Sequence, residues 1–308
     1  MEIVEVGPRD GLQNESAVVA TFDKIAYIEL LIAAGLRRIE AVSFVRPDRV
    51  PQMADAEAVM AGVPRRSDVR YIGLVMNRRG VQRAVACGVD EANIVVVATE
   101  TFSQRNQGMS IDASLAGLEG LVDEARRSGL SVTVTVGASY GCPFEGEVST
   151  AQVMKLVRRA NDLDVQEIAL ADTIGVGTPA DTTRLMDAAR AVTDKPLRLH
   201  LHNTRNTGYA NAYTAVAAGV SALDASSGGI GGCPFAPKAT GNIATEDLNY
   251  LLERTGTPLG LSHDELVAAA SFITEKLSIA TPALLGRAGW FPAASYPESI
   301  PGTSAVSV

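Results

Sequence analysis

IVEVGPRDGLQNE, residues 3–15, joins a short apolar run to a turn that carries Arg9 and Asp10 side by side. The run over residues 3–6 alternates too little for a solvated edge strand, so it predicts a buried parallel strand, which the following Gly-Pro pair ends. Because α/β folds place their chemistry at the C-terminal ends of such strands, the charged pair indicates an active site. A solvated ion pair in a surface turn is the alternative.

The composition limits what else the chain can be. Its 308 residues are 46% hydrophobic and 20% charged, enough to bury a large core. The net charge of -8, without runs of Lys and Arg, argues against nucleic acid and membranes as partners. A strand at the very start leaves no room for a targeting peptide, and no apolar stretch reaches transmembrane length. Three widely spaced cysteines fit a reducing compartment, so we expect a cytoplasmic protein.

A pattern of helix, glycine and β-rich run repeats along the chain. Glycines end four of the predicted helices, because a glycine just past a helix adopts the left-handed conformation without steric cost. They are Gly35, Gly88, Gly129 and Gly219. The predicted strands cover residues 3–6, 36–42, 69–75, 93–98, 130–136, 167–170, 197–201 and 221–225.

Eight strands in a chain of this length predict a closed (β/α)8 TIM barrel. A doubly wound open sheet is the alternative, but no glycine-rich phosphate fingerprint follows the first strand. We expect one barrel domain over residues 1–291, in which helices from about residue 262 pack outside the barrel. The remaining residues, 292–308, are rich in Pro, Ser and Ala and predict a flexible tail.

Polar residues gather at the ends of the predicted strands. In a barrel the βα loops form one face, so residues far apart in the sequence would converge there. They are Arg9 and Asp10 after the first strand, Glu40 and Ser43 in the second, Asp172 and Thr173 at the sixth, His200 to Asn203 at the seventh, and Gly228 to Cys233 after the eighth.

The seventh strand carries two of the three histidines of the chain, His200 and His202. At this spacing both rings project to one side of the strand, while Leu199 and Leu201 point to the other. A single buried histidine is usually a hydrogen-bonded core residue, but a His-x-His pair at the end of a barrel strand favours a metal site. Two neutral imidazoles with oxygen donors suit a divalent ion of the Mg, Mn, Co or Zn group.

The glycine-rich segment 228–235 is expected to form neither helix nor strand, and four glycines would let it move over a site. Cys233 on such a loop could exchange protons with a substrate, because its thiol needs only a modest pKa shift to do so near neutrality. Asn242 follows, and its amide oxygen could bind a metal or form a turn. The local sequence favours the turn.

Together these segments carry a set of family motifs. The motifs are EVGPRDGLQNE (5–15), IE (39–40), SFV (43–45), VPQM (50–53), DTIG (172–175), HLH (200–202), GGCPFA (231–236) and GNIATED (241–247). Over roughly residues 3–285 the chain closely resembles the 3-hydroxy-3-methylglutaryl-CoA (HMG-CoA) lyase family of the DRE-TIM metallolyase superfamily. The resemblance implies a TIM barrel that binds Mg or Mn and cleaves HMG-CoA to acetyl-CoA and acetoacetate. By motif match its metal ligands are Asp10, His200, His202 and Asn242.

A retro-aldol (Claisen-type) cleavage gives the other motif residues their expected roles. The substrate hydroxyl must lose a proton, for which Asp10 and His200 are both candidates. Arg9 would stabilise the thioester enolate, and Cys233 would then protonate it. Glu40 and Asp172 would orient the ligands or the substrate. The residues expected to contact substrate or CoA are Gln13, Ser43, Arg46, Asn106 and Thr173.

Two positions depart from the family pattern beside the expected substrate pocket. Asn203 follows the second histidine where the family often has an acidic residue, and Lys238 stands where a small residue is expected. A citramalyl-CoA-like thioester is therefore an alternative substrate of the lyase. A condensing synthase is disfavoured by the cysteine loop, and a non-catalytic acyl-CoA-binding barrel by the presence of the whole catalytic set. We expect an acyl-CoA substrate and a homo-oligomer, dimeric or larger.

Overall fold

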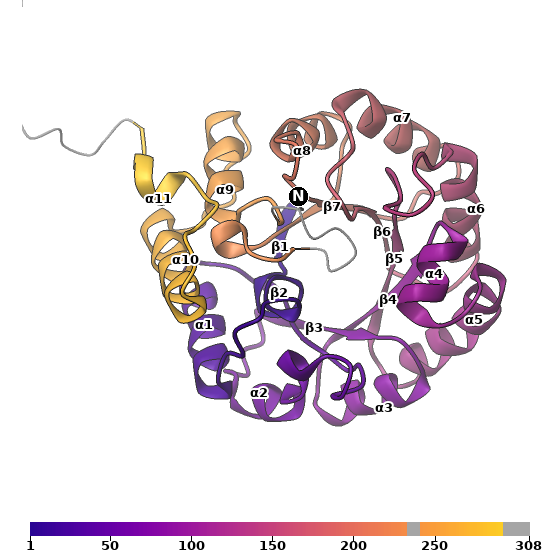
Figure 1. The fold of residues 1–308 in the computed structure, drawn as a ribbon, viewed down its shortest axis with the longest axis horizontal. Helices are drawn as coiled ribbons and strands as arrows, with labels where there is room; N and C mark the ends of the chain where they lie inside the picture. Colours follow the sequence, from indigo (N-terminus) through magenta and orange to yellow (C-terminus); the bar gives the residue numbers. More distant parts are fainter. Residues whose placement is uncertain (233–240, 292–308) are drawn as a thin grey trace, which may run out of the picture.

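The structure is a computed structural model that describes residues 1–232 and 241–291. Cys233, Lys238 and the predicted tail lie outside the described residues. Eight parallel strands of the described chain form a barrel surrounded by helices (Figure 1). The strands are β1 (Glu2–Glu5), β2 (Arg38–Ser43), β3 (Arg70–Val75), β4 (Glu91–Val97), β5 (Ser131–Gly137), β6 (Glu167–Asp172), β7 (Leu197–Leu201) and β8 (Ala222–Ala225).

The barrel is closed by its first and last strands. β1 pairs with β8 in parallel register, from Glu2 opposite Ala222 to Glu5 opposite Ala225. The predicted TIM barrel is therefore confirmed, and the alternative of an open sheet is wrong, because an open sheet would leave these two strand edges unpaired.

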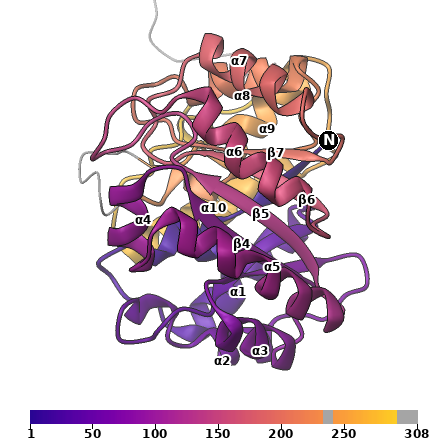
Figure 2. The same ribbon diagram turned by 90° about the vertical axis from the view of Figure 1, so that its right-hand side faces the viewer.

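The helices lie outside the barrel, with α4, α5 and α6 toward the viewer in the side view (Figure 2). They are α1 (Thr21–Ala33), α2 (Ala56–Gly62), α3 (Arg78–Ala86), α4 (Glu100–Gln107), α5 (Ile111–Arg127), α6 (Thr150–Asn161), α7 (Pro179–Arg190), α8 (Gly208–Ala217), α9 (Thr245–Arg254), α10 (His263–Leu277) and α11 (Leu285–Ala288). As expected for the segment after residue 262, α10 lies outside the barrel, against α1 and α9. No helix in the described ranges is long and apolar enough to cross a membrane.

Each predicted helix end coincides with a left-handed glycine. The φ angles are +102° at Gly35, +65° at Gly88, +86° at Gly129 and +75° at Gly219. Only glycine adopts this conformation without a steric penalty from a side chain, so these positions end the helices as the sequence predicts.

Strand β5 shows how the chain separates its two buried layers. Val132, Val134 and Val136 belong to the apolar core between barrel and helices. Thr133 and Thr135 alternate with them and point into the barrel, where their hydroxyls bind polar side chains of β4. The inner face of β5 is therefore polar, although its outer face is apolar.

At the N-terminal ends of the strands the interior holds a network of ions. Arg38 Nη2 lies 2.7 Å from Glu91 Oε1 and 2.7 Å from Glu167 Oε2. Arg38 Nη1 donates a 3.1 Å hydrogen bond to Glu2, and Arg198 Nε lies 3.3 Å from Glu167. These five residues are here called the base network. Four of them are buried and Glu2 is partly exposed, and the pairing of the buried charges satisfies a condition for keeping ions inside a barrel.

The glycine-rich segment differs from expectation at its start. A short 3-10 turn, η3 (Ser227–Gly229), covers its first two glycines, so the prediction that no helix forms there is wrong at these residues. The Gly228 N–H donates to the Glu246 carboxylate at 3.1 Å, and Gly229 N–H donates to the Ser226 carbonyl at 2.7 Å. These bonds stabilise the turn although Gly228 has a φ of +74°.

Candidate active site

The turn after β1 forms a π-helical segment, η1 (Gly7–Gly11), that presents Arg9 and Asp10. Gly7 N–H donates a 2.8 Å hydrogen bond to the buried Glu5 Oε1. A Cβ on Gly7 would lie 2.3 Å from Tyr27 Oη and 2.6 Å from Glu5 Oε1, closer than any real contact. The space at this position therefore suits glycine, and the turn that begins here brings Asp10 to the barrel mouth.

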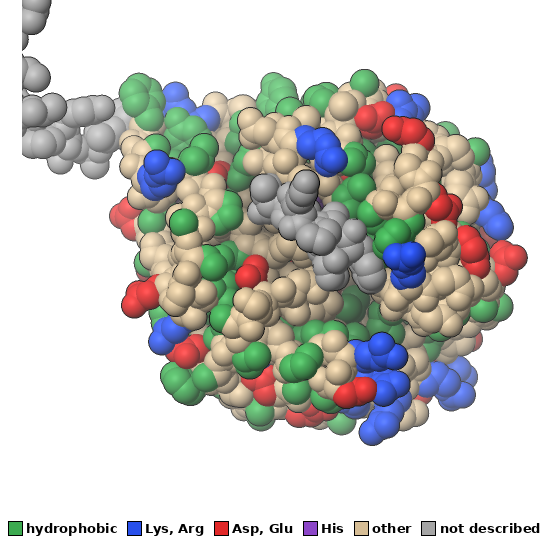
Figure 3. Space-filling model, viewed as in Figure 1, with side chains coloured by type: hydrophobic (Ala, Val, Ile, Leu, Met, Phe, Trp, Pro, Cys, Tyr) green, Lys and Arg blue, Asp and Glu red, His purple; other side chains and the backbone are tan. Residues whose placement is uncertain are grey.

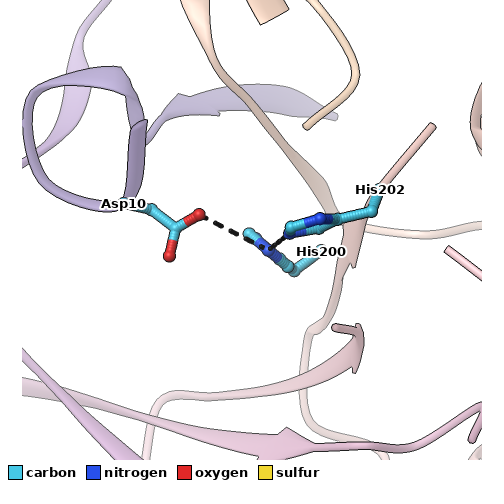
Figure 4. Close-up of side chains that lie close together, drawn as sticks. All are labelled: Asp10, His200 and His202. Atoms are coloured by element: carbon cyan, nitrogen blue, oxygen red, sulfur yellow. Dashed lines mark hydrogen bonds and ion pairs between the residues drawn. The ribbon is translucent and has the colours of Figure 1, made fainter. Parts of the chain in front are cut away.

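Asp10 meets His200 of β7 and His202, which follows that strand, at this mouth (Figure 4). His200 Nε2 lies 3.1 Å from His202 Nε2 and 3.8 Å from Asp10 Oδ2. Both rings are buried, and one ligand atom from each of the three residues lies within 4.8 Å of the others. The sequence prediction that these side chains converge, with both imidazoles on one side of β7, is therefore confirmed.

Asn242 lies beside this cluster. Its Nδ2 donates 3.0 Å hydrogen bonds to Asp10 Oδ2 and to the Ile230 carbonyl. Its Oδ1 is buried and has no hydrogen-bond partner among the described residues, and the same is true of His202 Nδ1. A free amide oxygen beside a carboxylate and two facing imidazole nitrogens is a donor set that fits a divalent cation.

Neighbouring charges set the protonation of the cluster. Burial disfavours the charged form of Asp10, but the positive charges of Arg9 and His200 outweigh it and hold the pKa of Asp10 well below its usual range. Burial and the neighbouring His200 lower the pKa of His202 to about 3. Burial alone would lower the pKa of His200, but its hydrogen bond to Asp224 and the charge of Asp10 raise it. An ionised carboxylate and a neutral imidazole are the forms that bind cations.

Arg9 is fixed by two carboxylates. Its Nε donates to Glu40 Oε2 and its Nη1 to Asp10 Oδ1, both at 2.8 Å. Glu40 Oε1 accepts a 2.8 Å bond from Asn93, whose own oxygen accepts one from the Thr135 hydroxyl, also at 2.8 Å. This series of hydrogen-bonded side chains from three strands holds the Arg9 guanidinium beside the cluster.

Asp172 and Thr173 lie at the end of β6 but bind their own surroundings. The Asp172 carboxylate is buried and accepts backbone N–H bonds from Val176 at 3.0 Å and Gly177 at 2.8 Å. The Thr173 hydroxyl accepts a 3.0 Å bond from the Ala138 N–H. Within the described residues, Asp172 therefore shapes the β6 loop and makes no hydrogen bond to the cluster.

The other residues expected to contact substrate fall into two groups. Ser43 Oγ and Gln13 Oε1 are buried polar atoms that have no hydrogen-bond partner within residues 1–232 and 241–291. Arg46 is exposed and donates a 3.0 Å bond to Asp48, and Asn106 is exposed on α4. Cys233 lies outside the described residues. Its neighbour Gly232 accepts a 3.1 Å hydrogen bond from Asn14 Nδ2 through its carbonyl.

Sequence reasoning missed Asp224 and Asn93. Asp224 Oδ2 lies 3.1 Å from His200 Nδ1, on the side of the ring opposite the cluster. Both missed residues are polar side chains at inward positions of buried strands, with exposed fractions of 6% and 3%. A carboxylate inside the short strand Ala222–Ala225 is the signal that could have identified Asp224.

The fold and the site define a TIM-barrel enzyme with a carboxylate–imidazole cluster at the C-terminal ends of its strands. The chain belongs to the HMGL-like family, whose model matches residues 1–273. This confirms the family resemblance read from the sequence.

Two relatives show what the chain is similar to. It is 42% identical to the mitochondrial hydroxymethylglutaryl-CoA lyase of Bos taurus, over 94% of this chain and 89% of that protein. It is 41% identical to the (R)-citramalyl-CoA lyase of Chloroflexus aurantiacus, over 93% of this chain and 94% of that protein. The two identities are too close to separate the two substrates.

Solved structures agree with the fold. The HMG-CoA lyase of Bacillus subtilis superposes with a TM-score of 0.90 at 38% identity and covers 93% of this chain and 96% of its own. An HMG-CoA lyase from Acinetobacter baumannii in complex with coenzyme A and 3-methylmalate gives 0.91 at 38% identity, with 96% of each chain covered. The carboxyl transferase domain of Rhizobium etli pyruvate carboxylase, at 16% identity and a TM-score of 0.70, shares the fold alone.

Proposed function

We propose that this chain is a divalent-metal-dependent carbon–carbon lyase that cleaves HMG-CoA into acetyl-CoA and acetoacetate. The observation that carries the proposal is the cluster of Asp10, His200 and His202 beside Arg9, at the mouth of a barrel of the HMGL-like family. The activities named for its lyase relatives support the same reaction.

Asp10, His200, His202 and the free oxygen of Asn242 would hold the cation. Mg²⁺ or Mn²⁺ suits this mixture of oxygen and imidazole donors. A divalent cation held there supplies Lewis acidity that makes the substrate hydroxyl a stronger acid. Because His200 binds protons more readily than a free histidine, cation binding at its Nε2 should release a proton and strengthen as the pH rises.

The protein groups would carry the protons and the charge. Asp10 takes the hydroxyl proton, or His200 if its Nε2 is not occupied by the cation. The bond between the hydroxyl-bearing carbon and its neighbour beside the thioester breaks, and the electron pair moves into a thioester enolate. Acetoacetate forms on the side that held the hydroxyl. A proton from Cys233 would then convert the enolate into acetyl-CoA.

Arg9 is the group we propose to stabilise the enolate. A guanidinium has five N–H donors, and the contacts with Glu40 and Asp10 leave N–H groups on Nη1 and Nη2 for the enolate oxygen. Arg9 is only 9% exposed, and a fixed cation is worth most where water is excluded. Glu40 would act by holding Arg9, and Asp172 by shaping the β6 loop.

Substrate contacts are proposed at the barrel mouth. The buried Ser43 Oγ and Gln13 Oε1 are proposed to contact the acyl group, and so is Thr173, which follows β6. Arg46 and Asn106 are exposed and available to CoA, whose phosphates need cations. Lys and Arg side chains lie around the rim of the face shown in Figure 3. Homo-oligomer formation and a cytoplasmic location stay predictions.

A citramalyl-CoA lyase is the second candidate, favoured by the relative from Chloroflexus aurantiacus and by Asn203. The Asn203 Oδ1 accepts a 3.1 Å bond from the Gly208 N–H at the start of α8. The family often has an acidic residue at this position, whereas the side chain here is neutral and binds the start of a helix. The negative charge of that acidic residue is therefore absent beside His202. This would alter which substrate carboxylate the site accepts.

One assay tests both candidates. The purified protein is incubated with HMG-CoA or citramalyl-CoA and Mg²⁺ or Mn²⁺, and acetyl-CoA, acetoacetate and pyruvate are measured. We expect cleavage that stops with excess chelator and returns when the metal is added back. Absence of cleavage of both thioesters, or full activity in chelator, would overturn the proposal. Net condensation of acetyl-CoA with a keto acid would favour the synthase.

A further inference from the structure

Both ring nitrogens of His200 face a polar partner. Its Nε2 faces His202 and Asp10, whereas its Nδ1 lies 3.1 Å from Asp224 Oδ2. His200 and Asp224 are paired residues of β7 and β8, and they are 8% and 6% exposed. The contact is therefore built into the barrel wall and shielded from water.

Arg198 forms an ion pair with the carboxylate oxygen of Asp224 that does not face His200. It lies two residues before His200 on β7, so both side chains point into the barrel. Arg198 Nε lies 3.4 Å from Asp224 Oδ1 and 3.3 Å from Glu167 Oε2, and the Arg198 side chain is 1% exposed. A buried guanidinium on one oxygen leaves the other oxygen of Asp224 for the imidazole.

The chemistry of the contact decides which His200 nitrogen carries the proton. An ionised carboxylate accepts hydrogen bonds and cannot donate them, so Nδ1 must be the protonated nitrogen. In a neutral ring the lone pair then belongs to Nε2, which points at the candidate cation ligands. The same contact opposes rotation of the ring about its Cβ–Cγ bond.

We propose that Asp224, held by Arg198, is the positioning residue that fixes the ring and the tautomer of His200 for cation binding. The inference rests on the metal site of the proposed function. It applies to one imidazole only, because His202 Nδ1 has no hydrogen-bond partner among the described residues. Loss of the Asp224 charge should therefore weaken the cation site through His200 and leave His202 unchanged.

The first test measures Mn²⁺ affinity by the electron paramagnetic resonance signal of free Mn²⁺ in the full chain and in Asp224→Asn. We expect about 10- to 100-fold weaker binding in the variant, the usual effect of losing a partner behind a metal ligand. Glu91→Gln is the matched control, since Glu91 is an equally buried carboxylate that binds Arg38 and Thr133 and does not touch His200. It should keep the wild-type affinity.

Wild-type affinity in a folded Asp224→Asn variant would overturn this inference alone. A wild-type chain without Mn²⁺ affinity would overturn the metal site of the proposed function, and the inference with it. Equal losses in Asp224→Asn and Glu91→Gln would reduce Asp224 to a structural role.

The second test needs no variant at Asp224 and so does not depend on its folding. Long-range ¹H–¹⁵N spectra of the Mg²⁺-loaded protein report which nitrogen of each imidazole is protonated. Only three histidines are present, so His263→Gln and His202→Gln suffice for assignment. We expect His200 protonated at Nδ1 and unprotonated at Nε2. A His200 ring protonated at Nε2 in the loaded protein would overturn the inference.

Discussion

At the scale of single residues, the site depends on how tightly Arg9 is held. Glu40→Gln keeps an oxygen for the Asn93 amide but removes the charge that fixes Arg9. We expect kcat to fall about 10- to 100-fold, as for other partners behind an active-site group. Mn²⁺ affinity should stay near wild type, because Glu40 does not contact the cluster. Lyase assays and Mn²⁺ titrations of the same preparation check both expectations.

Glu57→Gln is a suitable control for that change. This change also replaces a carboxylate that is paired with an arginine. The Glu57–Arg83 pair, however, lies on the surface, and the Glu57 side chain is 50% exposed. Its activity should equal that of the wild type. An unchanged kcat in Glu40→Gln would contradict the role given to Arg9.

Sequence reasoning could find residues that stand out from their neighbours. His200 and His202 could be predicted because their spacing places two imidazoles on one side of an apolar strand. Asp224 gives a weaker signal, because a lone carboxylate in a four-residue strand has no such spacing. Its partners come from other strands, and only the barrel register brings them within reach.

At the scale of elements, the η1 turn is the most demanding segment. Gly7→Ala places a methyl group 2.3 Å from Tyr27 Oη and 2.6 Å from Glu5 Oε1. We expect a loss of about 1–3 kcal/mol in the free energy of unfolding, the usual range for overpacking a core. Lyase activity should fall as well, because the turn carries Arg9 and Asp10. Urea denaturation and activity assays measure the two effects.

Gly120→Ala is the matched control in helix α5. A Cβ there meets nothing within 4 Å, and alanine is the better helix former, so stability should rise by about 0.5–1 kcal/mol. A Gly7→Ala variant as stable as Gly120→Ala would show that the turn accommodates a side chain.

Predicted strand positions are confirmed, but their ends differ for a physical reason. β4 begins at Glu91, although the apolar pattern places its start at residue 93. β6 extends to Asp172, two residues beyond the predicted end at 170. Both additions are buried carboxylates, one paired with Arg38 and the other with backbone N–H groups. Apolar patterns do not contain this information, because the compensating groups lie elsewhere in the chain.

At the scale of the whole molecule, buried carboxylates should make stability depend on pH. Burial raises the pKa of Glu5 from 4.5 to about 7, although hydrogen bonds from Thr245, Ser227 and Gly7 oppose it. The folded state therefore holds this proton more tightly than the unfolded state. Its contribution to stability is complete below about pH 4.5 and is lost as the pH rises through about 7.

Glu5→Gln should remove that loss. The amide oxygen can keep both backbone donors, and the amide nitrogen can donate to the Thr245 hydroxyl. We expect little change in the unfolding free energy at pH 5 and a gain of about 1–3 kcal/mol over wild type at pH 8. Urea denaturation between pH 5 and pH 8 measures it. The exposed Glu119→Gln should retain the wild-type slope, and an equal slope in Glu5→Gln would contradict the assignment.

The architecture as a whole was the easiest property to predict. Eight apolar runs separated by glycine-ended helices suffice to indicate a TIM barrel. The base network could not be predicted, because its charges belong to five separate positions that look like strand ends in the sequence. A pattern of apolar residues describes the outer wall of the barrel, whereas the interior follows from pairing between strands.

The pairing of β1 with β8 has a consequence for the order of folding. These strands are the first and the last of the barrel, so barrel closure is a contact of high sequence separation, and such contacts form slowly. Asp10 follows β1, while His200 belongs to β7 and Asn242 follows β8. A growing or refolding chain therefore gains full cation affinity only once its first and last strands have met. The moment at which cation affinity appears during refolding would therefore show when the barrel closes.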